Sequence, residues 1–240
     1  SSDGGGSACK QKRLVLKDAC SGTNPLSVIF VYLSPGDPGS GSTSSSSSDS
    51  TEEITFIACG GVDKMVSLYD LRGNRRAQWL LSGPVLALSH SDGLLAAACM
   101  DGAVYIIDMS ALPDKDAKPA GADLAAQSQV QLLEKHTKWA VGVKFSPDGT
   151  FLATLGHDRQ AHLYTHVSRD QHESAAASAK YKEECGVCCT SSSIHYDSLG
   201  VVLLPNTPES FVFVPAPNEA PCNAGFRLLV AVRDSLYFKS

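Results

Sequence analysis

The 240-residue sequence lacks long hydrophobic runs, a surplus of positive charge and an apolar leader segment. No apolar run approaches the ~18–20 residues that a helix needs to cross a bilayer, so we expect no membrane-spanning segment. Lys and Arg number 20 against 25 Asp and Glu. This mild acidity argues against a nucleic-acid binder, which concentrates Lys and Arg on one face. The first ten residues, SSDGGGSACK, contain neither Met nor a signal peptide, and indicate a fragment or a processed chain.

Motifs of common catalytic sites are also absent. The sequence contains no Gly-x-Ser-x-Gly elbow and no phosphate-binding loop that ends in Gly-Lys-Ser or Gly-Lys-Thr. Apolar residues nevertheless make up 43% of the chain, which is enough for a real core. Eight irregularly spaced cysteines without an export signal indicate mostly reduced thiols, and hence a cytoplasmic or nuclear protein.

Three segments share one arrangement: an apolar strand, a tight turn that contains Asp, and a second strand that ends in an aromatic or aliphatic pair. They are Ile54–Gly73, Pro84–Met109 and His136–His166. Apolar residues alternate with period two on either side of Asp-Gly turns, which is typical of antiparallel hairpins. The pattern therefore predicts an all-β protein.

The turn aspartates recur at a regular spacing once inserted loops are set aside. Asp63, Asp101 and Asp158 are separated by 38 and 57 residues, and Asp234 follows 76 residues later. The longer interval of 57 residues contains the polar segment 113–128, and without that segment 41 residues remain. A period near ~40 residues with four strands per unit is typical of a β-propeller blade. Each aspartate is expected to accept hydrogen bonds from backbone N–H groups of its own turn.

The units resemble WD40 repeats, and the third unit is the best match. In that family a His, a Ser or Thr, an Asp and a Trp form a hydrogen-bond network that ties the strands of one blade together. The resemblance implies that His136, Thr154, Asp158 and Tyr164 form this network. Tyr164 stands where the family has Trp, and Lys135 stands where it has Gly.

The resemblance also implies a fold: a WD40-type β-propeller segment of about four four-stranded blades, each opening with its outer strand, over residues 12–240. Residues 1–11 are expected to form a flexible N-terminus. The predicted blades are 12–73, 74–112, 129–165 and 200–240. Long polar insertions are predicted at 34–53, 113–128 and 166–199. Four units lie at the lower end of the ~4–8 blades of propellers, and WD40 rings are usually larger, so we expect part of a ring.

One group of residues offers a catalytic alternative to the structural network. His136, Asp158 and Thr154 have the residue types of a base, an orienting acid and a nucleophile. The WD40 resemblance favours a buried network instead. We therefore predict no catalytic residue and no small-molecule substrate.

A second group, Cys185, Cys188 and Cys189, includes the C-x-x-C spacing of two zinc ligands. Nearby His172 and His195 could supply the remaining ligands. A single pair of this kind is a weak signal, and incidental thiols in a loop are the favoured interpretation. We predict no metal and no cofactor.

Two positions are predicted partner contacts. Tyr69–Arg72 (YDLR) resembles the WDxR box of WD40 proteins that act as substrate receptors of cullin–RING ubiquitin ligases, with Tyr69 in place of Trp. In those proteins the Arg contacts the ligase adaptor, which gives Arg72 that role here. Trp139, near the start of a predicted inner strand, is an interaction anchor if exposed and ordinary core if buried.

The function expected from these features is a non-catalytic WD40-repeat scaffold that mediates protein–protein interactions in a multiprotein complex. Its partners are other proteins, and neither a membrane nor nucleic acid is expected. The alternative is a substrate receptor of a cullin–RING ubiquitin ligase, which would act through the YDLR motif.

Overall fold

The computed structural model describes residues 16, 20, 23–33, 54–109, 130–167, 195–215, 225–233 and 235–239. The regular structure of these residues consists of fifteen β-strands. No helix in the described part of the chain is long and apolar enough to cross a bilayer. The predicted all-β fold is therefore confirmed.

The strands form four antiparallel sheets, which we number along the chain. Sheet 1 contains β1 (Pro25–Leu33), β2 (Ile54–Gly61), β3 (Met65–Asp70) and β4 (Arg75–Leu80). Sheet 2 contains β5 (Val85–Ser91), β6 (Leu94–Cys99), β7 (Val104–Asp108) and β8 (Val130–Leu132). Sheet 3 contains β9 (Ala140–Phe145), β10 (Phe151–Gly156), β11 (Gln160–Val167) and β12 (His195–Leu203). Sheet 4 contains β13 (Pro208–Pro215), β14 (Phe226–Val232) and β15 (Ser235–Lys239).

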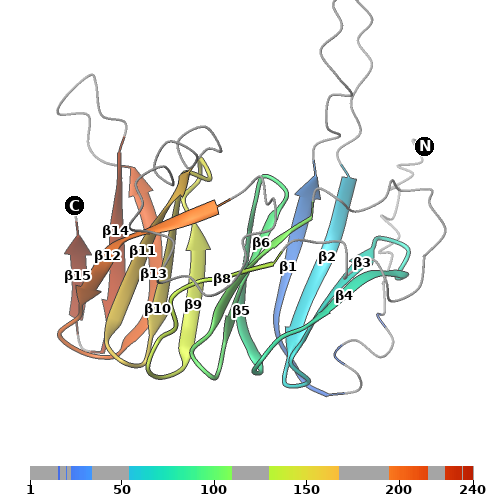
Figure 1. Cartoon of the computed structure of the whole chain (residues 1–240), viewed down its shortest axis with the longest axis horizontal. Helices are drawn as coiled ribbons and strands as arrows, with labels where there is room; N and C mark the ends of the chain where they lie inside the picture. Colours follow the sequence, from blue (N-terminus) through green and yellow to red (C-terminus); the bar gives the residue numbers. More distant parts are fainter. Residues whose placement is uncertain are drawn as a thin grey trace, which may run out of the picture.

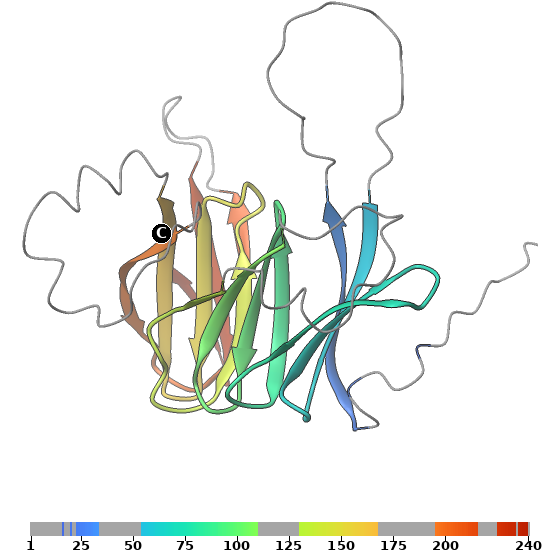
Figure 2. The same cartoon turned by 45° about the vertical axis from the view of Figure 1, so that its right-hand side comes forward.

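The four sheets stand side by side in chain order, from the blue strands of sheet 1 to the red strands of sheet 4 (Figures 1 and 2). The first strand of each sheet contacts the first strand of the next. Side chains also connect these strands: Ser27 Oγ accepts a hydrogen bond from Leu88 N at 3.2 Å, and Ser89 Oγ accepts one from Phe145 N at 3.1 Å. The ammonium of Lys144 donates to the carbonyl of Phe211 at 2.7 Å. This arrangement places β1, β5, β9 and β13 along a common inner side.

Apolar residues fill each interface between neighbouring sheets. The position of β6 between two such interfaces explains why its sequence is an unbroken apolar run. Leu95, Ala97 and Cys99 belong to the core between sheets 1 and 2. Leu94, Ala96 and Ala98 belong to the core between sheets 2 and 3. Because both faces of β6 are buried, apolar residues are favoured at every position on it. The three alanines also let the two flanking sheets approach closely.

The predicted blade boundaries are wrong by one strand. Residues 76–80 were expected to open the second blade, but β4 pairs with β3 in sheet 1. The reason is the tight turn Leu71–Asn74, which can only return the chain antiparallel to the strand just completed. The connection 81–84 then leads into sheet 2. β8 likewise pairs with β7 in sheet 2, and β12 pairs with β11 in sheet 3, each one sheet earlier than predicted.

The predicted insertion 166–199 is also too long. β11 continues to Val167, and β12 begins at His195 because Val167 pairs with His195 at the end of a ladder whose register shifts once, between Leu163 and Tyr164. Sheet 4 has three strands among the described residues rather than the expected four. The N-terminus 1–11, the insertions 34–53 and 113–128, and residues 168–194 lie outside the described residues.

The two faces of β1 differ in burial. On one face Val31 is fully buried in the core between sheets 1 and 2. The side chains on the other face are 44–58% exposed although all are large and apolar: Leu26, Val28, Phe30 and Tyr32. A strand that ends a row of packed sheets thus has an apolar face open to solvent.

Candidate functional site

Three hairpin turns at one end of the sheets have the same local structure, as the spacing of their aspartates predicted. The Oδ1 atoms of Asp63, Asp101 and Asp158 accept a hydrogen bond from the backbone N–H two residues later, at 3.2, 3.2 and 3.1 Å. The residue after each aspartate has a positive φ: Lys64 (66°), Gly102 (91°) and Arg159 (64°). Asp234, the fourth predicted turn residue, lies outside the described residues.

The structure brings His136, Thr154 and Asp158 together in a buried network. His136 Nδ1 lies 3.2 Å from both carboxylate oxygens of Asp158, and its Nε2 lies 2.8 Å from Thr154 Oγ1. Asp158 Oδ2 also accepts the N–H of Thr137 at 2.9 Å. The network thereby ties the chain before β9 to β10 and to the turn between β10 and β11.

Tyr164 lies beside this network but is not bonded to Thr154. Its hydroxyl donates to the carbonyl of Glu134 at 3.4 Å and lies 3.3 Å from His162 Nδ1. His162, which was not predicted as part of the network, packs against His136 with 4.0 Å between ring centroids and an interplanar angle of 31°. Its spacing from Tyr164 was the available signal, because residues two apart on a strand share one face.

Electrostatics favour neutral imidazoles beside a charged carboxylate. Burial, reinforced by the neighbouring His162, lowers the pKa of His136 in spite of Asp158. Burial also lowers the pKa of His162. Burial alone would raise the pKa of Asp158, but hydrogen bonds from Thr137, His136 and Gln160 outweigh it, and that pKa is lowered. In a neutral His136, Nδ1–H donates to Asp158 and Nε2 accepts the Thr154 hydroxyl.

This geometry makes the catalytic alternative unworkable at Thr154. The threonine has an exposed fraction of 0%, so no substrate can reach its hydroxyl. Both oxygens of Asp158 and both nitrogens of His136 are already occupied by hydrogen bonds. The arrangement can hold strands together, and that is its physical effect.

His136, Asp158 and His162 also have the residue types of a metal site, with potential ligand atoms within 4.8 Å of one another. Each imidazole nitrogen in this cluster already has a hydrogen-bond partner, since His162 Nε2 lies 3.1 Å from Gln160 Oε1. A cation would have to displace those partners. The zinc alternative at Cys185, Cys188 and Cys189 lies outside the described residues.

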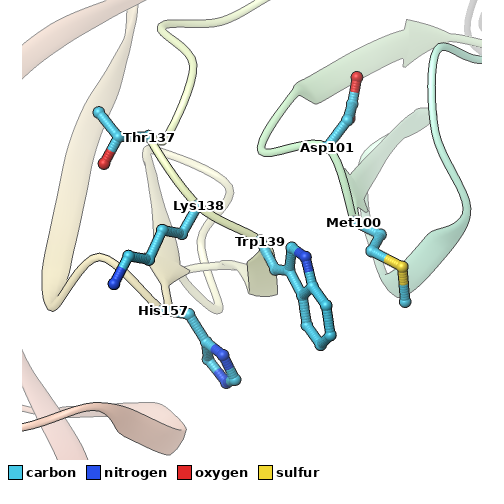
Figure 3. Close-up of a pocket in the computed structure, with 6 residues that line it drawn as sticks. All are labelled: Met100, Asp101, Thr137, Lys138, Trp139 and His157. Carbon is cyan, nitrogen blue, oxygen red and sulfur yellow. The ribbon is translucent and has the colours of Figure 1, made fainter.

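An open hollow of about 320 Å³ surrounds Trp139 at the same end of the sheets (Figure 3). It is lined by Met100, Asp101, Thr137, Lys138, Trp139 and His157. The indole ring of Trp139 stacks on the imidazole of His157, with 5.6 Å between centroids and an interplanar angle of 19°. Trp139 is 48% exposed, so it meets the condition under which it was predicted to be an interaction anchor.

Three backbone segments hold the hollow in shape. The N–H of His157 donates to the carbonyl of Trp139 at 2.9 Å and keeps the two rings side by side. The N–H of His136 donates to the carbonyl of Gly102 at 3.0 Å. A Cβ on Gly102 would overlap the carbonyl oxygen of His136 and lie 2.7 Å from that of Lys138, so only glycine permits this approach.

The two charged side chains that line the hollow, Asp101 and Lys138, differ in their hydrogen-bond and ion-pair partners. Asp101 Oδ2 accepts hydrogen bonds from Ser82 Oγ at 2.5 Å and from Lys135 Nζ at 3.3 Å. Burial alone would raise the pKa of Asp101, but these bonds and the N–H of Ala103 outweigh it and lower that pKa. Lys138, in contrast, is exposed and has no acidic partner among the described residues. As far as the described residues go, the hollow therefore presents one positive charge without an acidic partner.

Arg72 lies at the opposite end of the sheets, in the turn between β3 and β4. Asp70 Oδ1 accepts the N–H groups of Arg72 and Asn74 at 2.9 and 2.8 Å. Burial alone would raise the pKa of Asp70, but the bond from Asn74 Nδ2 to Oδ2 at 3.0 Å, the two backbone bonds and Arg76 at 3.7 Å outweigh it and lower that pKa. The Arg72 side chain is exposed. The two predicted contact residues, Arg72 and Trp139, therefore belong to separate surfaces.

Antiparallel sheets arranged side by side, with their first strands on a common inner side, define a β-propeller segment. Within it, residues 127–165 match the family described as WD domain, G-beta repeat. That stretch runs from β8 into β11 and contains the network of His136, Thr154 and Asp158. Residues 127–165 thus form a WD40 repeat within a β-propeller segment, and the third repeat was the unit that the sequence pattern had singled out as the best match.

Solved structures with a similar fold include BBS1N in complex with ARL6DN, from a crystal soaked with lead. It is 11% identical, has a TM-score of 0.50, and the match covers 90% of this chain and 52% of that one. The WD40 β-propeller domain of Doa1 is 15% identical with a TM-score of 0.45, over 76% of this chain and 45% of that one. The chain thus spans about half the length of these two. No curated protein sequence matches it.

Proposed function

We propose that this chain is a non-catalytic scaffold that binds other proteins in a multiprotein complex through the surface around Trp139. The observation that carries the proposal is the half-exposed Trp139 ring, stacked on His157 beside an open hollow. Folding removes most large aromatic side chains from water, so an exposed and rigidly held Trp is a typical anchor for a protein partner.

The fold supports a binding role rather than a catalytic one. WD40 propellers are in general platforms for protein interaction, and the solved structure of BBS1N contains a bound protein, ARL6DN. The side chains of His136, Thr154 and Asp158, the group with catalytic residue types, are buried and occupied by hydrogen bonds. Loops held by such a rigid frame are left free to contact partners.

A location in the cytoplasm or nucleus belongs to the same proposal. Among the described residues, Cys20, Cys59 and Cys99 are buried free thiols. Burial raises the pKa of Cys59 to about 11 and that of Cys99 to about 12. Free, unreactive thiols are ordinary in proteins of reducing compartments.

Affinity capture tests the proposed contact surface. The chain is immobilised and incubated with a cell lysate, and the proteins retained are compared between the wild type and Trp139→Ala. We expect Trp139→Ala to lose partners that the control Leu80→Ala retains, because Leu80 is an exposed apolar residue on the outer strand of sheet 1. An identical set of proteins on all three samples would show that the Trp139 surface is not the contact.

The ligase-receptor alternative depends on the opposite end of the sheets. Its support is the exposed Arg72 in a turn that Asp70 holds in place. Arg72→Ala should then lose cullin–adaptor subunits from the captured set while Arg75→Ala, an exposed neighbour, retains them. Unchanged recovery of these subunits, or no recovery from the wild type, removes this alternative.

A further inference from the structure

We infer that the hollow beside Trp139 binds an aromatic side chain of a partner segment that carries acidic residues on either side. The inference rests on the proposed function and specifies the chemistry of the partner. Three properties of the hollow lead to it: its size, its aromatic wall and the sign of its free charge.

The size of the hollow fits one side chain. Its volume of about 320 Å³ lies at the lower end of the range of ~300–1,000 Å³ in which proteins enclose whole small molecules. The hollow is open on one side, so a side chain can enter while its own backbone remains outside. This geometry suits a protruding residue of a protein segment better than an enclosed substrate.

The wall of the hollow selects for a flat apolar group. In Figure 3 the indole of Trp139 lies between the imidazole of His157 and the thioether of Met100. Aromatic rings interact favourably with an offset or edge-on ring, and a methionine sulfur contacts a ring edge favourably. An aromatic side chain can therefore contact both the indole and the Met100 sulfur.

The hollow is also organised before any ligand arrives. The hydrogen bond from His157 N to Trp139 O fixes the stacked rings relative to each other. The contact of Gly102 with the segment 136–138 fixes the distance between the two sides of the hollow. Binding thus requires little ordering of the protein, which lowers its entropic cost.

The free charge favours an acidic partner over a basic one. Asp101, the carboxylate that lines the hollow, is neutralised by Lys135 and saturated by hydrogen bonds. Lys138 lines the hollow without an acidic partner in the described residues. The charge of Glu134 acts on His136, His162 and Tyr164, none of which lines the hollow. A carboxylate beside the inserted ring gains from Lys138, whereas a cation is repelled.

Fluorescence anisotropy of labelled synthetic peptides tests the inference. The probe peptide carries a central Phe flanked on both sides by Glu and Asp. One comparison peptide replaces Phe with Ala, and another replaces the acidic residues with Lys. We expect the probe to bind, and each replacement to weaken binding about tenfold or more. Added salt should weaken binding of the probe as well.

Protein variants locate the binding. Trp139→Ala and Lys138→Glu should each weaken binding of the probe about tenfold, since the first removes the aromatic wall and the second reverses the free charge. The matched control is Lys64→Glu. Lys64 is an exposed cation in the turn of Asp63 in sheet 1, and it does not line the hollow. This control variant should bind as the wild type does. Urea unfolding of every variant verifies that it remains folded.

Each other outcome overturns the inference. Tighter binding of the Lys peptide would show that the hollow recognises cationic segments, and equal binding of the Ala peptide would show that no aromatic side chain enters it. No binding of the probe refutes the inference outright. If the probe does not bind but Trp139→Ala still loses partners in the capture experiment, the proposed function stands and only the ligand chemistry fails.

Discussion

Gly102→Ala is the substitution that tests most directly how the Trp139 hollow is built. Lys64 and Arg159 occupy the equivalent turn positions with φ values of 66° and 64°. The left-handed backbone alone therefore does not require glycine in these turns. What distinguishes Gly102 is the pair of carbonyl oxygens, from His136 and Lys138, that its Cβ would meet.

The expected cost follows from these contacts. A left-handed conformation costs a non-glycine residue about 1–2 kcal/mol. At Gly102 the added Cβ also pushes the segment 136–138 away and disrupts hydrogen bonds of His136 to Gly102 and to Asp158, at about 1 kcal/mol each. We expect Gly102→Ala to lower the free energy of unfolding by about 3–4 kcal/mol. Gly93 is the matched control, because its φ is 77° but its Cβ would meet nothing closer than 3.9 Å, so Gly93→Ala should cost only about 1–2 kcal/mol.

Urea unfolding followed by far-ultraviolet circular dichroism measures both values. Iodide quenching of fluorescence gives a local readout, because Trp79 is buried and Trp139 is half-exposed. Gly102→Ala should change the quenching of Trp139, and Gly93→Ala should not. Equal destabilisation by the two substitutions would refute the argument that a close approach, rather than backbone conformation, requires glycine at position 102.

Three further predictions concern the buried polar groups. Burial lowers the pKa values of His136 and His162. Below about pH 6.5 the unfolded chain therefore binds more protons than the folded chain. The free energy of unfolding should fall by up to about 1.4 kcal/mol for each imidazole with every unit by which the pH is lowered. Denaturation at several pH values measures this, and a flat profile contradicts it. Asp158→Ala should destabilise the fold by about 2–4 kcal/mol and Asp158→Asn by less, because Asn keeps an acceptor; equal losses in urea unfolding would be inconsistent with this. Gln131→Leu should cost about 1–3 kcal/mol in the same assay, because the Gln131 amide exchanges two hydrogen bonds, at 3.0 and 3.1 Å, with the backbone of Tyr196 across two sheets; an unchanged midpoint would show that these bonds contribute nothing.

The sequence was sufficient to predict the hairpins and the β-propeller class. Turn aspartates and alternating strands are local features, so Asp63, Asp101 and Asp158 could be recognised without knowledge of the fold. The assignment of each strand to its sheet was harder to predict from the sequence. β4 follows its turn into sheet 1 rather than sheet 2, and only the tightness of the turn after Asp70 distinguishes the two arrangements.

At the candidate site, too, local features could be predicted from the sequence and contacts between sheets could not. Trp139 was identified from its position, but Met100 and His157 were not, because they come from turns of two different sheets. Their approach depends on the packing of sheet 2 against sheet 3, which no local pattern encodes. His162 was missed for a related reason, since its contact with His136 joins β11 to the chain before β9. The spacing of Thr154 and Asp158 from His136 was recognised through the family resemblance.

The outward face of β1 has a practical consequence for anyone who purifies this chain. An exposed hydrophobic strip runs along the strand and consists of Leu26, Val28, Phe30 and Tyr32. Such strips cause proteins to adsorb on hydrophobic resins and to precipitate at high concentrations of ammonium sulfate. Since Val31 on the opposite face of β1 lies in the core with sheet 2, a glutamate in place of Phe30 should improve solubility and leave that core intact.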